Sequence, residues 1–350
     1  MIHKQLMRTN IVLIILILAV ATIIALIPPR AVMTPGNELK MATWGMPFED
    51  LLFRDVYARG FEKENPGWSI HYQRHGHLVE KYNAWHVQRR GADVMRMGID
   101  YYKSFVAKGM LAPLTEYLND PEIGLSEEEI KDYFPAIWEQ LLIDGEIYAL
   151  PSDNSQYGLY YNKTIFDQYN EAHPDEPLDY PGQHWTWDDL ADATQRLTVR
   201  NTEGQDRRIT QYGILFDLWA WPYFAFLKQA GGNMWDEAQT TTLINSEAGV
   251  EALTYLVSLV PPDAPMRSPD QAASAASPVE LFKTGHLAML LDGSWQAPSI
   301  ERDKPGLNFA IAPCHAGNSR ASSAVRSSGR SAPHSHHPHC LGDGQVDHEP

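Results

Sequence analysis

Residues 146–163, EIYALPSDNSQYGLYYNK, hold two short apolar runs of β-strand character on either side of a polar break. The first run is 147–150, and the second, 157–161, is rich in the aromatic side chains that favour strands. The break at 151–155 carries Ser, Asp and Asn, so it places hydrogen-bonding groups between two apolar segments. We interpret it as a crossing between two lobes, because clefts between domains are preferred ligand sites. An ordinary β-turn inside one sheet is the alternative, since these residue types dominate turns.

The length and composition allow two domains, each with a core of its own. The chain has 350 residues, of which 44% are hydrophobic and 11% are aromatic. Its net charge of −16 argues against a nucleic-acid partner, because phosphates are neutralised by clustered Lys and Arg that this chain lacks. The acidic balance indicates solubility rather than a particular partner.

Residues 1–36 have the composition of an export signal. Lys4 and Arg8 precede an apolar run at 11–27, which two prolines close. As a helix the run is about 26 Å long, a little short of a hydrocarbon core of roughly 30 Å, so cleavage and retention as a membrane anchor are both open. The absence of a small-x-small cleavage motif directly after the run favours an uncleaved anchor. Either reading places the chain beyond Thr34 in the periplasm or at the cell surface.

Residues 37–151 alternate strand and helix patterns, which predicts a first α/β lobe. The expected elements are strands at 39–44, 68–73 and 94–98 and helices at 48–63, 79–89, 102–108 and 130–142. Asp100 and Tyr101 follow the third strand, where residues line the ligand crevice of open α/β sheets. Ser126 with Glu129 predicts a capping box before the last of these helices.

Residues 152–312 are expected to form a second α/β lobe. The expected helices are 164–169, 187–197 with a Thr or Asp cap, 247–260 and 278–283, and the expected strands are 212–216, 287–291 and 308–312. The most aromatic stretch of the chain, 218–229, lies in this lobe and contains Trp219 and Trp221.

From Pro313 the character of the chain changes. Residues 313–350 have no sustained periodicity and are rich in Ser, Arg, His and Pro, so we assign no secondary structure to them. Both cysteines, Cys314 and Cys340, lie in this tail. The two lobes are therefore expected to hold no disulfide.

Several segments, taken together and in order, resemble the carbohydrate-binding group of bacterial ABC-transporter extracellular solute-binding proteins, called family 1. The matching pieces are WG at 44–45, ADVM at 92–95, Asp100, GMLAPL at 109–114, YALP at 148–151, LYYNK at 159–163, WDDL at 187–190, FKTGHLAM at 282–289 and DGSW at 292–295. Each piece is weak alone, whereas the ordered set covers roughly residues 39–313 and is strong.

The resemblance implies a two-lobe α/β fold of the periplasmic-binding-protein-like kind (type II), which closes on a sugar and presents it to a membrane permease. In such proteins aromatic rings lie against the apolar faces of the sugar, and carboxylates and amides bind its hydroxyls. Closure is a hinge motion that the ligand stabilises. We accordingly expect a monomer that binds a small carbohydrate, works with ABC permease subunits and needs no cofactor or metal.

The candidate ligand-binding residues are carried over by position from the resemblance. They are Trp44, Glu49, Asp100, Tyr101, Asp153, Asn154, Tyr157, Trp219, Trp221, Gly293 and Trp295, with Gly293 allowing close backbone approach. Simpler roles stand beside them. The tryptophans can be core residues, Asp100 can cap a helix, and Glu49 can be a solvated carboxylate in a first helical turn.

Two other functions are alternatives from the sequence. An extracellular carbohydrate-active enzyme could use paired carboxylates such as Asp100 and Asp153 as acid and base. The histidines of 334–340 could bind a metal, although their spacing is not that of a structured site. Phosphate-binding glycine loops, Gly-x-Ser-x-Gly elbows and Cys-x-x-Cys pairs are absent from the sequence, which favours the binding protein.

The tail departs from the family pattern. In the family the chain continues after the strand that corresponds to 309–313, crosses back to the first lobe and adds further helices, and residues 314–350 do not resemble that continuation. We hypothesise a change of reading frame near Pro313, which would leave the two-lobe fold incomplete at its C-terminus.

Overall fold

The computed structural model describes residues 37–76, 78–201, 208–236, 240–262, 264 and 277–313. These residues divide into two compact units between Ser152 and Asp153. Within the described ranges no helix has both the length and the apolar character needed to cross a membrane. The apolar run at 11–27 and the tail beyond Pro313 lie outside the described residues.

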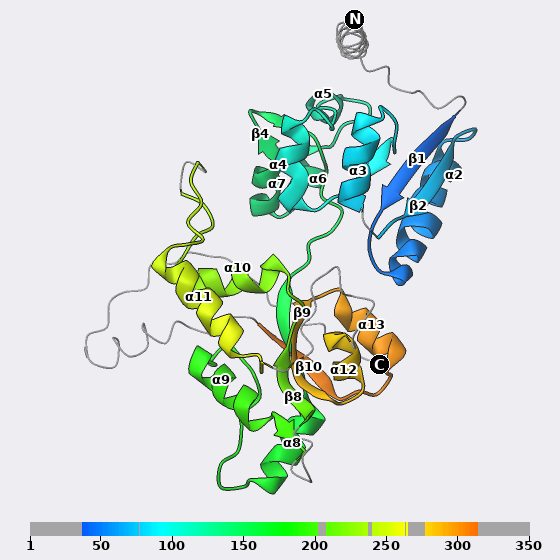
Figure 1. Ribbon diagram of the computed structural model, residues 1–350. Helices are drawn as coiled ribbons and strands as arrows, with labels where there is room; N and C mark the ends of the chain where they lie inside the picture. Colours follow the sequence, from blue (N-terminus) through cyan, green and yellow to red (C-terminus); the bar gives the residue numbers. More distant parts are fainter. Residues whose placement is uncertain are drawn as a thin grey trace, which may run out of the picture. The chain divides into compact units, whose positions relative to one another are not determined.

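The first unit contains a three-stranded parallel sheet in the order β2-β1-β3 (Figure 1). Its strands are β1 (Glu38–Thr43), β2 (Ser69–Arg74) and β3 (Val94–Met95). β1 lies in the middle and pairs with β2 along its whole length, from Glu38 opposite Ser69 to Thr43 opposite Arg74. Because all three strands are parallel, their carboxyl ends meet at one edge of the sheet.

Helices and a hairpin complete the first unit. They are α3 (Leu78–Val87), α4 (Ile99–Ala107), α5 (Thr115–Leu118), α6 (Glu127–Lys131), α7 (Pro135–Leu141), β4 (Leu142–Ile143) and β5 (Glu146–Ile147). Tyr82 joins them to the sheet, because its ring is buried beside Phe105 and its hydroxyl lies 3.0 Å from the carbonyl of Ala42 and 2.9 Å from that of Arg96. The tyrosine therefore ties β1 to the residue that follows β3.

The helix expected at 48–63 is divided into η1 (Pro47–Glu49), η2 (Leu51–Ala58) and α2 (Arg59–Glu64). η2 is wound as a π-helix, so the residues that share its inner face are five apart. Phe53 and Ala58 are buried at that spacing, whereas Leu51 and Val56 are exposed. The expectation of a regular amphipathic helix was wrong because it assumed a period of 3.6 residues.

Three further boundaries differ from those expected. The helix at 130–142 is broken, and Pro135 begins α7 because proline fits the first helical turn but not the interior of a helix. The run at 147–150 is a strand only up to Ile147, which pairs with β4 through a turn in which Asp144 and Gly145 both have positive φ. β3 ends at Met95 rather than at residue 98.

The second unit contains a five-stranded mixed sheet in the order β10-β6-β9-β8-β7. Its strands are β6 (Tyr157–Asn162), β7 (Val199–Arg200), β8 (Ile209–Leu215), β9 (Leu287–Gly293) and β10 (Phe309–Pro313). β8 and β9 are parallel, whereas β6 runs antiparallel to both β9 and β10. β5 and β6 thus belong to different sheets, so the alternative of a turn inside one sheet at 151–155 is wrong.

Both faces of this sheet are covered by helices (Figure 1). They are α8 (Lys163–Ala172), α9 (Trp187–Arg196), α10 (Ala220–Gln229), α11 (Glu247–Ser258), α12 (Pro278–Lys283) and α13 (Gln296–Asp303). Leu159 and Leu291 pack under α8 to α11, and their strand neighbours Tyr160 and Leu290 pack under α12 and α13. This alternation explains why β9 is apolar along almost its whole length.

The expected helix starts are confirmed at Ser126 and Thr186. The side chain of Ser126 accepts from the N–H of Glu129, and that of Thr186 accepts from the N–H of Asp189. In return, the carboxylate of Glu129 accepts from the N–H of Ser126, and that of Asp189 accepts from the N–H of Thr186. These capping boxes are local features, which explains why the sequence alone predicts them.

Candidate functional site

In the first unit, Trp44 and Gly45 follow the carboxyl end of the central strand β1. Gly45 has a φ of +139°, and a Cβ there would lie 2.2 Å from Oε2 of Glu49. Only glycine permits this close turn of the backbone. The turn brings the first residues after β1 back toward Arg96, which follows the neighbouring strand β3.

Arg96 organises the side chains at this edge. Its guanidinium donates to Oε1 of Glu49 and to the carbonyl of Trp44, both at 2.8 Å. It also lies 4.7 Å from the centroid of the Trp44 ring and 4.9 Å from that of Phe53, so the cation is held between two aromatic rings. The Trp44 residue is nevertheless 40% exposed. An aromatic surface that is fixed from behind and open to solvent is suited to stacking against a ligand.

Glu49 supports this arrangement. One carboxylate oxygen binds Arg96, and the other accepts from the backbone N–H of Met46 at 2.5 Å. The side chain is 18% exposed. Both carboxylate oxygens of Glu49 therefore have protein partners, so the simpler alternative of a solvated carboxylate in a first helical turn is wrong.

Asp100 and Tyr101 lie in the first turn of α4 rather than in a loop, because this helix begins at Ile99, soon after β3 ends at Met95. The N-cap is Gly98, so the alternative of Asp100 as the cap is wrong. The Asp100 carboxylate folds back over the helix start, 2.2 Å from where a Cβ of Gly98 would be. The residue as a whole is exposed, but the protein around its carboxyl removes water from it and so raises its pKa. Hydrogen bonds from the backbone N–H groups of Asp100 and Tyr101 lower the same pKa, and their effect is the smaller one. The Tyr101 residue is 40% exposed.

In the second unit, the candidate residues gather at the carboxyl edge of the parallel pair β8 and β9. Asp217 and Trp219 follow β8, and Asp292 to Trp295 end β9 and follow it. The antiparallel strand β6 starts at the same edge, where Tyr157 is paired with Gly293. Asp153 and Asn154 are exposed residues of the irregular segment that precedes β6.

Trp295 is held by its neighbours in a defined orientation. Its ring meets that of Tyr157 edge to face, with centroids 5.5 Å apart. A Cβ at Gly293 would lie 2.1 Å from the indole, so the glycine leaves room for the ring. We expected Gly293 to let a ligand approach the backbone closely. In the structure the indole of Trp295 occupies the space beside this glycine.

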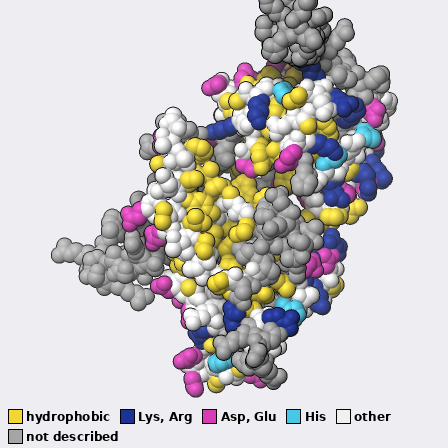
Figure 2. Space-filling model, viewed as in Figure 1, with side chains coloured by type: hydrophobic (Ala, Val, Ile, Leu, Met, Phe, Trp, Pro, Cys, Tyr) yellow, Lys and Arg dark blue, Asp and Glu magenta, His cyan; other side chains and the backbone are white. Residues whose placement is uncertain are grey.

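Trp219 and Trp221 are surface residues at the start of α10. They are 50% and 38% exposed, so the simpler alternative of core tryptophans is wrong for this pair. The tryptophan that fills the core beside Phe166 is Trp185. Figure 2 shows hydrophobic side chains gathered at the surface over α10 and α11. Trp219 is the N-cap of α10, and Trp221 lies in its first turn.

Asp292 is a site residue that sequence reasoning missed. Its Oδ1 accepts from the N–H of Gly293 at 2.7 Å and its Oδ2 from Nε2 of Gln296 at 2.9 Å. Burial raises the pKa of this carboxyl to about 6, and the nearby carboxylate of Asp217 adds to the effect. The sequence offered a signal, because Asp292 ends the apolar run 287–291 inside one of the segments that carry the resemblance, DGSW.

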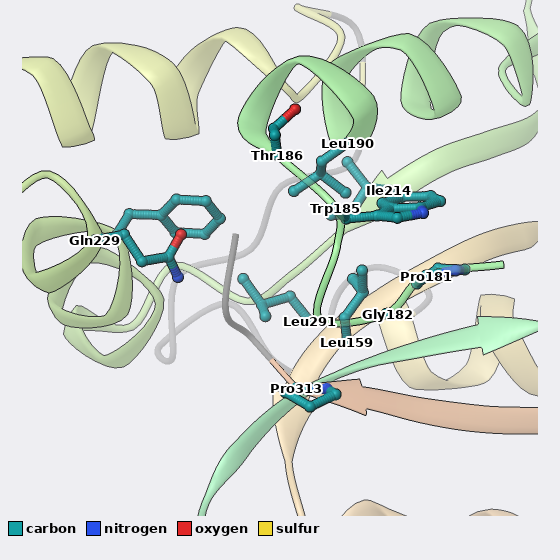
Figure 3. Close-up of a pocket in the computed structure, with 11 residues that line it drawn as sticks. Leu159, Pro181, Gly182, Trp185, Thr186, Leu190, Ile214, Gln229, Leu291 and Pro313 are labelled. Atoms are coloured by element: carbon teal, nitrogen blue, oxygen red, sulfur yellow. The ribbon is translucent and has the colours of Figure 1, made fainter. Parts of the chain in front are cut away.

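A small apolar cavity in the second unit is not the ligand site. It measures about 30 Å³ and is lined by Leu159, Pro181, Trp185, Ile214, Leu291 and Pro313, among others (Figure 3). None of the candidate residues lines it. A cavity of this size has room for only about two waters, so a sugar does not fit.

Two α/β units with open aromatic rings at their sheet edges define a two-lobe binding protein. Residues 36–319 match the model of the bacterial extracellular solute-binding protein family. The chain belongs to this family, so it is an exported protein of the two-lobe periplasmic-binding-protein fold.

Curated proteins and solved structures agree with this assignment. A Brucella abortus (strain 2308) protein, named as a binding protein, is 24% identical over 268 residues, which are 76% of this chain and 60% of that protein. The maltotriose-binding protein of Pyrococcus abyssi is 21% identical over 224 residues, or 64% of this chain and 42% of that protein. This chain therefore spans less than two thirds of the length of these relatives.

Two solved structures share the fold at 25% identity. One is an ABC substrate-binding protein of Listeria monocytogenes in complex with cycloalternan, with a TM-score of 0.62 over 78% of this chain and 65% of that one. The other is the GacH receptor of Streptomyces glaucescens, studied unliganded and with acarbose, with a TM-score of 0.60 over 80% and 67%. The first is named as a substrate-binding protein and the second as a receptor.

Proposed function

We propose that this chain is the extracellular substrate-binding component of an ABC transporter for the uptake of a sugar or oligosaccharide. The observation that carries the proposal is the pair of half-exposed aromatic surfaces, Trp44 in one unit and Trp219 in the other, at carboxyl edges of the sheets. The relatives named for maltotriose, cycloalternan and acarbose support a carbohydrate as the ligand class.

The chemistry of the two edges fits a carbohydrate. Indole and phenol rings cover the C–H faces of a sugar, and carboxylates and amides bind its hydroxyls. We propose Trp44, Tyr101, Trp219, Trp221 and Trp295 as the stacking residues. The hydroxyl partners in this proposal are Asp100, Asp153 and Asn154, with Tyr157 beside the ring of Trp295 and Glu49 as a support.

The partners and location follow from the same proposal. The protein would act as a monomer that delivers unaltered sugar to ABC permease subunits. The run at 11–27 would serve as a signal peptide or a membrane anchor on the exported chain. N-terminal sequencing of the exported protein separates the two, because only a cleaved chain lacks Lys4 and Arg8.

The proposal is tested by calorimetric titration of the full chain with maltotriose, acarbose and cycloalternan. Trp44→Ala is expected to weaken binding by at least about tenfold, because the stacking surface is lost. Trp68→Ala is the matched control, since Trp68 is 41% exposed and precedes β2, at the opposite edge of the same sheet. It should change the affinity by less than about twofold.

Two outcomes would contradict the proposal. If none of the three saccharides, nor a wider panel that includes mannitol and ribitol, binds to a folded chain, the ligand class is wrong. If the chain hydrolyses a bound oligosaccharide, as chromatography of the sugar would show, the protein is an enzyme and the alternative based on Asp100 and Asp153 gains support.

A further inference from the structure

The turn from β9 into α13 presents Trp295 at the edge of the second sheet. The turn is fixed to β6 at its start, where the N–H of Ser294 donates to the carbonyl of Gln156 at 2.8 Å. Trp295 itself is the N-cap of α13, and its indole, which has an N–H donor but no acceptor, makes no cap hydrogen bond. The indole is oriented by the groups that it contacts.

Asp292 clamps this turn on both sides of Trp295. Its Oδ1 accepts from the N–H of Gly293, before the tryptophan, and its Oδ2 accepts from the amide of Gln296, after it. Gln296 is 9% exposed, so the second bond is made where water does not readily replace it. Both carboxylate oxygens are thus used to hold the two residues that flank the segment 294–295.

The space around the indole leaves it little freedom. Gly293 gives it room on one side, and Tyr157 meets it edge to face on another. A shift of the turn would change both contacts. The turn is also linked to the buried face of the sheet, because the hydroxyl of Tyr160 donates to the carbonyl of Gly293 at 2.8 Å.

We propose that Asp292 is a positioning residue that holds the ring of Trp295 in the orientation a carbohydrate ligand requires. This inference rests on the proposed function, and Asp292 acts through Trp295 rather than by binding the sugar. It adds a residue to the candidate site and predicts a dependence of binding on pH.

The charge of Asp292 gives the pH dependence its sign. The titratable groups that face it among the described residues are Asp217, from the connection after β8, and Tyr160, from β6. Burial raises the pKa of Asp292 to about 6. An ionised carboxylate accepts stronger hydrogen bonds than a neutral acid. The clamp is therefore firm above this pKa and loosens as the pH falls through it.

The first experiment needs no ligand. The fluorescence of Trp295 is obtained as the difference between the full chain and its Trp295→Phe variant, each with and without a change at Asp292. Asp292→Ala is expected to move the Trp295 emission to longer wavelength, because the ring becomes more solvated. Asp292→Asn should keep the emission near its low-pH position and abolish its change between about pH 5 and pH 7, since Asn resembles the neutral acid and does not titrate.

A second pair of variants separates positioning from a merely structural role. The bond from Gln296 lowers the pKa of Asp292, whereas the charge of Asp217 raises it. Gln296→Leu should therefore move the midpoint of the Trp295 fluorescence change to higher pH, and Asp217→Asn should move it to lower pH. Midpoints that do not move, or that move in the same direction, overturn the proposal even if Asp292→Ala fails to fold.

The third measurement is the affinity for maltotriose at different pH values. The affinity of the unmodified chain should fall by about fivefold or more from pH 7.5 to pH 5, and that of Asp292→Asn by less than about twofold. Equal pH dependence in the two chains overturns the proposal. If no saccharide binds, the proposed function fails, and the ligand-free fluorescence still decides whether Asp292 positions Trp295.

Discussion

At the scale of single residues, each edge orients one tryptophan, the exposed Trp44 or the half-buried Trp295, through a charged side chain. Arg96 holds Trp44 from behind, and Asp292 holds the turn that carries Trp295. A large aromatic side chain on a surface loses stacking energy if it must first be ordered by the ligand. Fixing the ring in the free protein removes that cost, so we propose that these charges favour binding without touching the ligand.

Arg96 gives a prediction about stability at this scale. Arg96→Met is expected to lower the free energy of unfolding by about 2 kcal/mol, because it leaves the largely buried carboxylate of Glu49 without its cation. The double variant Arg96→Met with Glu49→Gln should recover part of the loss, since the unpaired charge is gone. Urea unfolding followed by fluorescence measures both. A double variant no more stable than the single one would show that the ion pair is not the cause.

At the scale of elements, a buried lysine joins two helices of the second unit. Nζ of Lys283, at the end of α12, lies 2.8 Å from Oδ2 of Asp303, at the end of α13, and 3.0 Å from Oε1 of Glu280. The side chain of Lys283 is 8% exposed. The two helices cover the same face of the sheet, so this ion pair helps to fix α13 and the turn before it.

The ion pair predicts a change of stability in acid. Hydrogen bonds from Arg302 and Lys283 lower the pKa of Asp303 to about 2, below its value of 3.8 in an unfolded chain. A lowered pKa stabilises the fold above 3.8, and this stabilisation is lost as the pH falls from there to about 2. Lys283→Met should weaken this part of the pH dependence, as acid titration followed by circular dichroism would show. Unchanged acid sensitivity would mean that Arg302 alone controls Asp303.

At the scale of the whole molecule, each hydrophobic cluster formed by the described residues lies within one unit. The clusters around Phe105 and around Tyr102 lie in the first unit, and those around Phe166 and around Phe282 lie in the second. Units with separate cores are able to unfold separately, since each loses its own buried apolar area.

The two capping boxes test this separation. Ser126→Ala should lower the unfolding transition of the first unit alone, and Thr186→Ala that of the second alone, each by about 1 kcal/mol. Differential scanning calorimetry of the full chain distinguishes two transitions from one. If both variants lower the same transition, the two units unfold as one cooperative body.

The amino-acid sequence by itself determined the class of fold, the order of most strands and helices, and the capped helix starts at Ser126 and Thr186. Those features depend on neighbours in the chain: Thr186 caps α9 through a residue three positions later, and the apolar run of β9 marks a strand covered on both faces. The same reasoning placed Trp44 at the end of a strand and Trp219 and Trp295 after strands, because strand ends are visible in the sequence.

Only the tertiary structure decided which groups these residues meet. Asp217 faces Asp292 because β8 pairs in parallel with β9, and Arg96 reaches Glu49 because β3 lies beside β1. Such pairs join residues far apart in the chain, so no local pattern records them. The π-type winding of η2 is decided in the same way, since hydrophobic spacing gave a regular helix and the backbone adopted another period.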